Sequence, residues 1–459
     1  MANAPLNRAE LIDRIWERDP TVWTGGEEAK WLGWLDEPRR MAERVDELVA
    51  FADAVAEEGL DAVVLLGMGG SSLAPEVLRR TFRVQSFHVL DTTHPQAIRR
   101  VEESIDLERT LFVSASKSGG TLETRSHTDY FWELTRGRGA AFVAITDPGS
   151  DLERTARERG FRHVFPGEPT IGGRYSALSP FGMVPAALMG IDVERLLGNA
   201  GLMADACRRD DGNPGYELGR AFGTGWQEGR DKICIAETEG SFGLWAEQLI
   251  AESTGKEGKG LVPAPGESPN GPDRQAAEPQ VADPYALGGE FFRWEFAVAV
   301  AGSYLGINPF DQPDVQAAKD KTNEVLATGK EPAVEPEGSI DALLGDANEG
   351  DYVCVQAFIE PNEQNDRRIG ELVATLRARS GLVVTHGYGP RYLHSTGQLH
   401  KGGPNTGLFL QVVDDPGEEI AIPGKPFGFR RLLRAQAAGD YASLKERGRR
   451  AVRVRIEEV

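Results

Sequence analysis

The chain has 459 residues, which is long for one hydrophobic core and predicts two or three domains. Hydrophobic residues make up 40% of it and charged residues 27%, a balance typical of globular rather than disordered proteins. A formal net charge of −20 disfavours nucleic acid and anionic membranes as partners. An anionic metabolite remains compatible with it, because a local group of backbone N–H donors outweighs a distant net charge.

The cysteines and the N-terminal residues indicate the cellular compartment in which we expect the protein. Cys207, Cys234 and Cys354 are odd in number and far apart, so we expect neither a disulfide framework nor a zinc site. No apolar run reaches the roughly 18 residues of a spanning helix. Residues 1–19 lack the apolar core of a secretory signal. We therefore predict a cytoplasmic protein that binds no membrane.

The first half of the chain predicts helices followed by an α/β unit. Residues 1–55 carry Glu, Arg, Trp and Leu at helical spacing, which indicates helices packed on the adjoining α/β unit. Apolar strands that end in Gly-, Ser- or Thr-rich turns then alternate with helices. These strands lie within residues 61–70, 87–95, 110–120 and 140–150. Such alternation predicts crossover connections and a parallel sheet with helices on both faces.

The alternation of strands and helices recurs twice further along the chain. Residues 232–241 predict a strand followed by helices at 242–255 and 290–306, with a Gly- and Pro-rich functional loop at 255–285. A third α/β unit comes after a linker near residue 331. We therefore predict two doubly wound parallel-sheet domains and a small C-terminal α/β module. The expected limits are 1–55 for the helical segment, 56–210 and 211–330 for the two domains, and 331–459 for the module.

Two strand–loop–helix junctions are the strongest local signal of a ligand site. Ligands of open parallel sheets bind beyond the carboxyl ends of the strands, where helix N-termini offer free N–H donors. Small hydroxyl side chains add donors there, and together the two loops favour a phosphate group, although each alone is also explained by an N-cap with turn glycines. The loop residues are Gly70 and Ser71 after the first strand, and Ser116, Lys117, Ser118 and Thr121 after the third. Neither loop is a P-loop, and GMGGSS lacks the third glycine of the dinucleotide fingerprint, which argues against an oxidoreductase.

Four segments resemble recognised blocks of the phosphoglucose isomerase family, both in amino-acid sequence and in their order along the chain. They are VLLGMGGSSLAPEV, SASKSGGTLET, GGRYSALSPFGM and GINPFDQPDVQAAK, within residues 61–319. Residues beyond about 340, including GYGPRYLHSTGQLHKGGPNTG, look like the isomerase half of transaldolase–isomerase fusions. The resemblance implies sugar-isomerase (SIS) domains, no cofactor and no metal. It implies interconversion of glucose 6-phosphate and fructose 6-phosphate by ring opening and proton transfer through a cis-enediolate.

The resemblance also implies roles for the loop residues and for one arginine. The four residues of the 116–121 loop would hold the substrate phosphate, with Gly70 and Ser71 lining the sugar site. Arg174, in GGRYS, would sit beside the C1 and C2 oxygens, where a fixed cation stabilises the enediolate charge.

The proton carrier and a further cation are implied by shorter matches. Glu267, in PAPGESPNG, resembles the family's catalytic glutamate and would move the proton between the two carbons. Glu252, in ESTGK, also resembles a family segment and would take a supporting role. Lys319 matches the family's C-terminal active-site lysine and would either stabilise oxygen charge during ring opening or bind the sugar hydroxyls. Lys256 is expected to be solvated.

One departure from the family concerns the histidine that opens the sugar ring. In the common form it follows the catalytic glutamate, but this sequence has no histidine between His163 and His386. His394 and His400, in a polar loop of the C-terminal module, are the best replacements, and His386 is better explained by packing in a strand. If one of them takes the role, the module must cover the sugar pocket.

Three questions stay open at the level of sequence. A non-catalytic SIS-type sugar-phosphate sensor would keep the phosphate loops without the chemistry, but it would need neither Arg174, Glu267 nor Lys319. Mannose 6-phosphate would serve as a second substrate if the same base acts on either C2 epimer. The family is commonly a homodimer, whereas the extra module would allow one chain to complete its own site.

Overall fold

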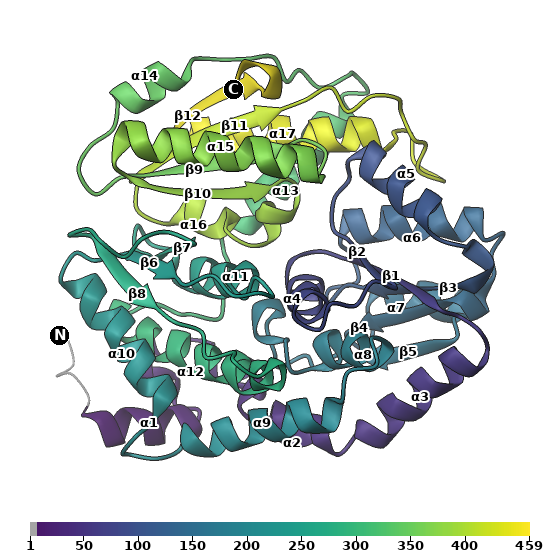
Figure 1. Ribbon diagram of the computed structural model, residues 1–459, viewed down its shortest axis with the longest axis horizontal. Coiled ribbons are helices and arrows are strands. Elements are labelled where there is room, and N and C mark those ends of the chain that lie inside the picture. The colour runs from purple at the N-terminus through teal and green to yellow at the C-terminus, as the bar shows by residue number, and fades with distance from the viewer. Residues whose placement is uncertain (1–6) are drawn as a thin grey trace.

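The computed structural model describes residues 7–459, apart from the side chains of residues 315–319. The described chain contains three β-sheets in which the named strands pair in parallel. Figure 1 shows one sheet on the right, one on the left and the third above both, with helices packed around them. The predicted α/β class with parallel sheets is confirmed. Among the described helices, none has the length and apolar character needed to cross a bilayer.

The first sheet has five strands in the order β2-β1-β3-β4-β5. Alternate residues of β1 point to opposite faces, so Val63 and Leu65 join one hydrophobic core while Val64 and Leu66 join another. The sheet is therefore buried by helices on both sides. Its strands are β1 (Ala62–Gly67), β2 (Phe87–Leu90), β3 (Thr110–Ala115), β4 (Phe142–Thr146) and β5 (His163–Pro166). Its helices are α4 (Leu73–Thr81), α5 (Pro95–Ser104), α6 (Leu122–Leu134), α7 (Asp151–Glu158) and α8 (Pro180–Leu188).

This strand order reverses between β1 and β3. The chain leaves β1 toward β2 on one side and returns to β3 on the other, so the loops after β1 and β3 diverge at the carboxyl edge. Ligands of open α/β sheets bind in the crevice at such a reversal. The two loops singled out in the sequence are those that follow β1 and β3, and the sheet therefore brings them side by side.

The second sheet has three strands in the order β7-β6-β8, and α11 (Gly243–Thr254) packs on β7. The strands are β6 (Lys232–Ile235), β7 (Val262–Pro265) and β8 (Arg274–Ala277). Two of them lie within residues 255–285, which we expected to be a loop. The glycines and prolines of this stretch mark its turns, and its two strands are only four residues long, too short to give a clear alternation.

Buried and surface helices join the two sheets at the base of the molecule. Helix α12 (Leu287–Leu305) is buried over almost its whole length, which explains its apolar character on all faces. It packs closely on α10, because a side chain at Gly219 would collide with the carbonyl oxygen of Ala297. The remaining helices of this layer are α1 (Arg8–Trp16), α2 (Glu37–Ala42), α3 (Val45–Glu57), α9 (Val193–Ala206) and α10 (Pro214–Gln227).

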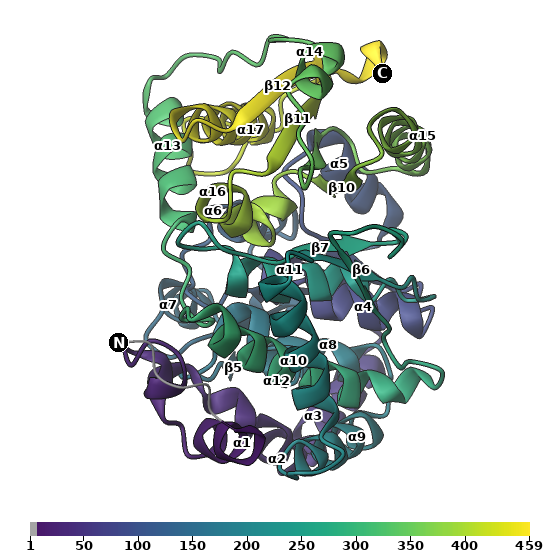
Figure 2. The same ribbon diagram turned by 90° about the vertical axis from the view of Figure 1, so that its left-hand side faces the viewer.

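The third sheet forms the C-terminal module, with strand order β10-β9-β11-β12. Figure 2 shows that the module sits on top of the other two units rather than beside them. Helix α13 packs on α17, so residues 315–327 join the module although the predicted boundary was 330/331. The strands are β9 (Tyr352–Phe358), β10 (Val383–Tyr388), β11 (Gly407–Val413) and β12 (Arg450–Arg455). The helices are α13 (Val315–Ala327), α14 (Ile340–Gly345), α15 (Glu363–Ser380), α16 (Gly397–Gly402) and α17 (Phe429–Glu446).

A buried ion pair ties α16 to α17 inside the module. Lys401 Nζ lies 2.6 Å from Asp440 Oδ1, and the two side chains are 1% and 0% exposed. The hydroxyl of Tyr392 donates to the other carboxylate oxygen at 2.5 Å. Removing one member of such a pair leaves an uncompensated buried charge, which is costlier than losing a surface pair.

We therefore expect Lys401→Met to lower the free energy of unfolding by about 3–5 kcal/mol. The control is Lys445→Met on α17, whose exposed ammonium lies 3.5 Å from Glu337, and we expect a change of no more than about 1 kcal/mol. Chemical denaturation followed by circular dichroism measures both. Equal losses in the two variants would contradict the role of the buried pair.

Candidate functional site

Two short turns at the β1/β3 reversal form the base of the candidate site. The 3-10 turn η4 (Gly69–Ser71) follows β1, and residues 116–121 link β3 to α6. The hydroxyls of Ser116 and Thr121 lie 2.9 Å apart and close the second loop. Ser116 is buried at the end of β3, whereas Ser118 is exposed at the loop tip. The loop thus presents hydroxyl and backbone N–H donors next to the N-terminus of α6, as an oxyanion requires.

The ammonium group of Lys117 is paired with other groups of the protein and is not free to bind a ligand beside these hydroxyls. Its Nζ lies 2.8 Å from both carboxylate oxygens of Asp147 and donates to the Glu168 carbonyl at 2.7 Å. Burial lowers the pKa of Lys117, and Asp147 counteracts this effect. The predicted role of Lys117 in phosphate binding is therefore limited to its backbone and to its effect on the loop, since its ammonium is already paired.

The turn after β1 is in direct contact with the segment that carries Arg174. A Cβ at Gly70 would lie 2.1 Å from the carbonyl oxygen of Gly173, so only glycine allows η4 to approach η7 (Gly173–Tyr175) this closely. Gly69 is equally constrained, because a Cβ there would lie 2.4 Å from the His394 carbonyl oxygen. The GMGG run is thus explained by close backbone approach on two sides.

Arg174 is 1% exposed, and its guanidinium is surrounded by five acceptor groups. Nη1 lies 3.2 Å from Glu252 Oε1, the single carboxylate within ion-pair distance of Arg174 among the described residues. The other acceptors are Ser253 Oγ at 2.7 Å, Gln312 Oε1 at 2.9 Å, and the carbonyl oxygens of Pro309 at 2.7 Å and Asp311 at 3.0 Å. Because the N–H groups of Arg174 are already bonded within the protein, the guanidinium affects the site through its positive charge and through its ion pair with Glu252.

Glu252 is oriented from a second side by its own helix. Gln248, one turn earlier on α11, donates from Nε2 to Glu252 Oε2 at 2.9 Å and to the His394 carbonyl at 2.8 Å. The Glu252 side chain keeps 13% exposure, so its carboxylate is fixed but accessible. The spacing of Gln248 and Glu252 at i and i+4 on one helix was the sequence signal for this arrangement.

Glu267 lies in a different place from the one its predicted role requires. Its side chain is 0% exposed, and Oε1 accepts from Arg377 Nε at 2.9 Å, from Arg377 Nη2 at 2.7 Å and from the Val384 N–H at 3.1 Å. Arg274 Nη1 is 3.7 Å from Oε2. These partners belong to β8, α15 and β10, so Glu267 joins the second sheet to the C-terminal module. The structure does not bring it to Arg174.

The two candidate histidines have different surroundings. His394, at the end of η9 (Arg391–His394), places Nε2 2.9 Å from Glu123 Oε1. Glu123 is the second residue of α6, directly after the hydroxyl loop, and it also accepts from Gln436 Nε2 at 2.7 Å. The module therefore reaches the site through His394, as covering the pocket requires.

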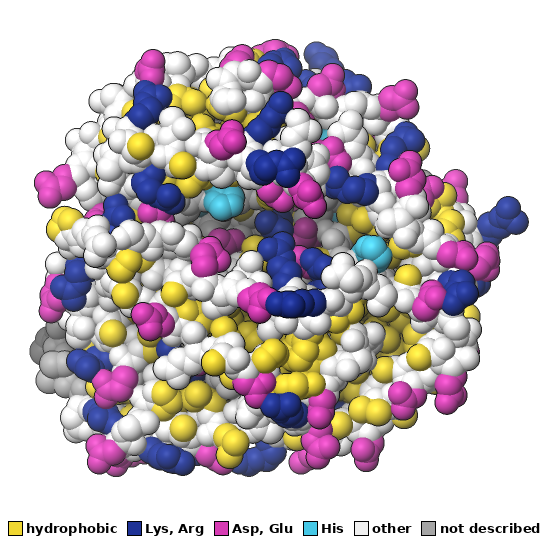
Figure 3. Space-filling model, viewed as in Figure 1, with side chains coloured by type: hydrophobic (Ala, Val, Ile, Leu, Met, Phe, Trp, Pro, Cys, Tyr) yellow, Lys and Arg dark blue, Asp and Glu magenta, His cyan; other side chains and the backbone are white. Residues whose placement is uncertain are grey.

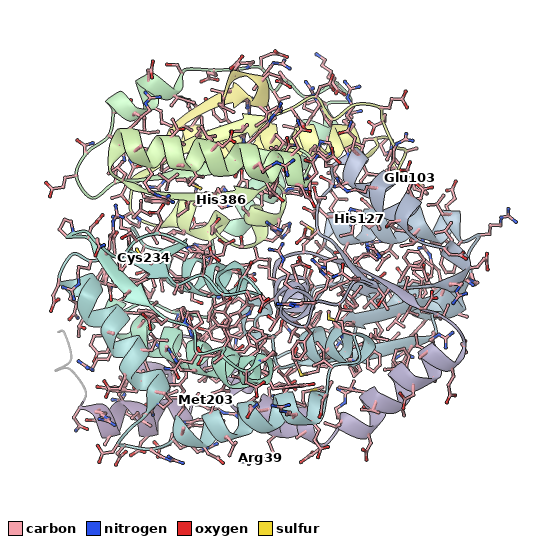
Figure 4. All side chains as sticks on the ribbon, in the orientation of Figure 1. Arg39, Glu103, His127, Met203, Cys234 and His386 are labelled. Carbon is pink, nitrogen blue, oxygen red and sulfur yellow. The ribbon has the colours of Figure 1, made fainter. Side chains whose placement is uncertain are left out.

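His400 does not reach the site. It is 2% exposed, with Nε2 3.5 Å from Cys354 Sγ and Nδ1 3.2 Å from the Gln356 amide nitrogen. Burial holds the pKa of His400 well below its ordinary value. Helix α16 turns this residue into the core of the module, so the structure does not bring His400 to the hydroxyl loop. The labelled His127 in Figure 4 is likewise buried, on α6, and contacts the Thr92 carbonyl at 3.0 Å.

Two lysines named in the sequence analysis remain to be located in the structure. Lys319 lies in α13, but its side chain is outside the described residues. Lys256 was expected to be solvated, yet it is 2% exposed and donates to the carbonyls of Asn308 at 2.7 Å and Asp311 at 2.5 Å. Burial, with Arg174 nearby, lowers the pKa of Lys256 to about 8. Lys256 and Arg174 thus fix the segment that leads to Gln312 and α13.

No group of three His, Cys, Asp or Glu side chains suited to a metal occurs in the part of the chain that the structure describes. The chemistry available is that of a hydroxyl loop, a carboxylate held by a buried cation, and an imidazole paired with a carboxylate. A carboxylate and an imidazole together supply two proton carriers.

Comparisons with known proteins place the chain among similar sequences. Residues 35–209 match the family model described as Phosphoglucose isomerase. The protein named Glucose-6-phosphate isomerase from Synechococcus sp. is 36% identical over 210 residues, 42% of this chain and 40% of that protein. Its namesake from Nostoc sp. is 31% identical over 281 residues, 56% and 51% of the two chains. The chain thus spans about half the length of the curated relatives it matches.

Solved structures support the fold. A hypothetical protein from Thermus thermophilus has a TM-score of 0.61 at 24% identity, over 70% of this chain and 94% of that one. A glucose-6-phosphate isomerase from Chlamydia trachomatis has a TM-score of 0.51 at 20% identity, over 71% and 78%. The parallel sheets and the helices around them define an α/β protein with the fold of these two solved structures. Residues 35–209 match the phosphoglucose isomerase family model, and the chain is similar to proteins named glucose-6-phosphate isomerase over about half of their length.

Proposed function

We propose that this protein interconverts glucose 6-phosphate and fructose 6-phosphate by ring opening and proton transfer through a cis-enediolate. The observation that carries the proposal is the 3.2 Å contact between Glu252 and the buried Arg174, next to the turn after β1. Relatives that are named glucose-6-phosphate isomerase support the choice of substrate. A non-catalytic sensor would have no use for an accessible carboxylate fixed beside a buried cation.

The substrate phosphate would bind at residues 116–121. The hydroxyls of Ser116, Ser118 and Thr121 and the free N–H groups at the start of α6 suit a phosphate monoester. Gly70 and Ser71 would line the sugar, since their turn lies between this loop and Arg174. Lys319 would act on the sugar oxygens, as the family resemblance implies.

Glu252, rather than Glu267, would be the base. It would take the C2 proton of glucose 6-phosphate and return it to C1, while a proton moves between the C1 and C2 oxygens. The intermediate enediolate carries negative charge, which the fixed guanidinium of Arg174 stabilises without reorganising. Mannose 6-phosphate differs only in the configuration of C2, and we include it as a candidate second substrate.

His394 would open the ring by moving a proton to the ring oxygen. Its 2.9 Å contact with Glu123 fixes the ring and would stabilise the imidazolium. Because His394 comes from the C-terminal module of the same chain, the proposed site does not depend on a second subunit. A homodimer is compatible with it but is not required.

The cellular compartment is part of the same proposal. The three thiols are free and buried, which suits a reducing compartment, and we propose a cytoplasmic role in carbohydrate metabolism.

We also propose the limits of the domains. They lie at 56–210 and 211–330 after the N-terminal helices at 1–55, with a C-terminal module at 331–459 that α13 extends. The packing of α13 on α17 supports that extension.

The assignment of the base is tested by comparing two glutamates. In a coupled assay starting from fructose 6-phosphate, we expect Glu252→Gln to lower kcat by about 10²–10⁴-fold, the usual size of a general-base effect. Glu267→Gln is the matched control, and we expect it to reduce stability but to retain kcat within about tenfold, since its contacts are structural. Full turnover by Glu252→Gln would refute the mechanism.

The ring-opening role is tested by His394→Ala. We expect activity on glucose 6-phosphate, which is mostly cyclic, to fall by about 10²-fold, because a general acid is lost. His400→Ala is the control for the module, and any activity loss should follow its loss of folded protein. Equal specific activity of wild type and His394→Ala, corrected for folded protein, would rule His394 out.

The phosphate site is tested by Ser116→Ala combined with Thr121→Ala. Hydrogen bonds to a charged group are worth about 1.5–3 kcal/mol each, so we expect KM for fructose 6-phosphate to rise by at least about tenfold. The value of kcat should change less than KM, because these hydroxyls are remote from C1 and C2. An unchanged KM would refute the phosphate assignment.

A further inference from the structure

A second polar cleft lies where the C-terminal module meets the other two units. It consists of two adjoining cavities of about 280 Å³ each. The side chains that line both are Arg80, Asp366, Tyr388 and Arg391. The face in Figure 3 is hollowed near its centre, and basic side chains lie in this hollow. In the same orientation Figure 4 places His386, which lines the first cavity, below α15.

Arg391 has few protein partners for a side chain in such a place. Its side chain is 18% exposed, and within the described residues its guanidinium makes no hydrogen bond. The ion-pair contact it has there is with Asp91, at 3.8 Å. A largely buried guanidinium normally has its donors satisfied by the protein, as Arg174 does.

Glu247 faces the same cavity from α11 and has fewer partners than Arg391, which also lies 5.9 Å from the centre of the Tyr388 ring. Among the described residues, its carboxylate has neither a hydrogen bond nor an ion pair within 4.0 Å. Glu247 and Arg391 line the same cavity, but they form no ion pair within 4.0 Å. Two opposite charges that face one cavity without meeting leave room for a bound molecule between them.

We propose that this cleft binds a small hydroxylated oxyanion, a polyol that carries a phosphate or a carboxylate group. Arg391 would take the oxyanion, because a planar guanidinium binds phosphate and carboxylate in a bidentate manner. Arg80 lines both cavities and would add positive charge, although its Nε is already paired with Glu76 Oε1 at 2.6 Å. Glu247 and Asp366 would accept hydrogen bonds from the hydroxyl groups. The combined volume suits a compact metabolite, and such sites are common between domains.

The cleft also contains acidic groups, and their protonation affects the proposal. Glu247 from α11, Glu237 before it and Asp366 from α15 would repel an anion, as would Glu76 from α4 and Asp91 after β2 in the second cavity. Arg80, Arg100 and Arg391 would attract it. Burial raises the pKa of Glu247 to about 7, so near neutrality the group is partly neutral. Burial and the nearby Arg391 lower the pKa of His386 from β10, which keeps that imidazole neutral. Anion binding therefore strengthens as the pH falls through about 7, since protonation of Glu247 removes a negative charge and adds a donor.

The cleft is linked to the candidate active site by the turn η9. Arg391 begins this turn and His394 ends it. A molecule bound to Arg391 would therefore shift or fix the position of His394. Helix α11 provides a second link, with Glu247 facing the cleft and Gln248 bound to the His394 carbonyl. Occupancy of the cleft would thus alter ring opening more than phosphate binding.

Binding is tested by calorimetry on the full chain with Ser116→Ala and Thr121→Ala, which removes the catalytic phosphate loop as a competing site. The probes are glycerol 3-phosphate and glycerate, which separate phosphate from carboxylate, with glycerol as the neutral control. We expect one or both anions to bind, and glycerol not to. Arg391→Met added to this protein should weaken binding of the anion at least about tenfold, whereas Arg368→Met, an exposed arginine of α15 outside both cavities, should not.

The pH dependence gives a second readout. The parent protein should bind the anion more tightly at about pH 6 than at about pH 8, and Glu247→Gln should abolish most of that difference. If Arg391→Met fails to fold, Arg391→Lys replaces it, and it should weaken binding because bidentate contact is lost. Absence of anion binding by the parent, equal affinity in the Arg391 and Arg368 variants, or equal binding of glycerol would each overturn the proposal. None of these results depends on whether the protein isomerises sugars.

Discussion

The guanidinium of Arg174 is the interaction on which the rest of the candidate site depends. It joins the turn η7, the end of α11 and the segment 309–312, three parts of the chain that are far apart in sequence. A buried cation is tolerated only when its donors are matched, and here five acceptor groups surround it. This requirement fixes Glu252 and Gln312 in place, and Lys256 reinforces it from the other side of Asp311.

The C-terminal module is the second determinant of the site. Its contacts are not those of an appendage, because His394 reaches Glu123 in the first unit and Gln398 donates to the Gly255 carbonyl in the second at 2.9 Å. The sequence has no histidine in the long loop of residues 255–285, and the module places His394 beside the start of α6. A single chain supplies both proton carriers of the proposed reaction.

The sequence predicted the fold class, the parallel sheets and the two ligand loops, because each rests on a local pattern. Apolar strands that end in small residues and lead into helices need few tertiary contacts to be recognised. It did not reveal that Glu267, in its glycine-rich loop, forms a buried ion pair with Arg377. It also did not separate His400 from His394, because the two have similar neighbours in sequence. The choice between the two is made by α16, which turns His400 into the core.

The sequence by itself determined the alternation of strands and helices and the chemistry at the end of β1 and β3, since both follow from residue type and spacing along the chain. Only the tertiary structure decided which carboxylate meets Arg174, which histidine enters the site, and which lysine is already paired. Those outcomes depend on contacts between residues separated by tens to hundreds of positions. A buried charge takes the partner that the packing brings within hydrogen-bond distance, and no local pattern records that partner.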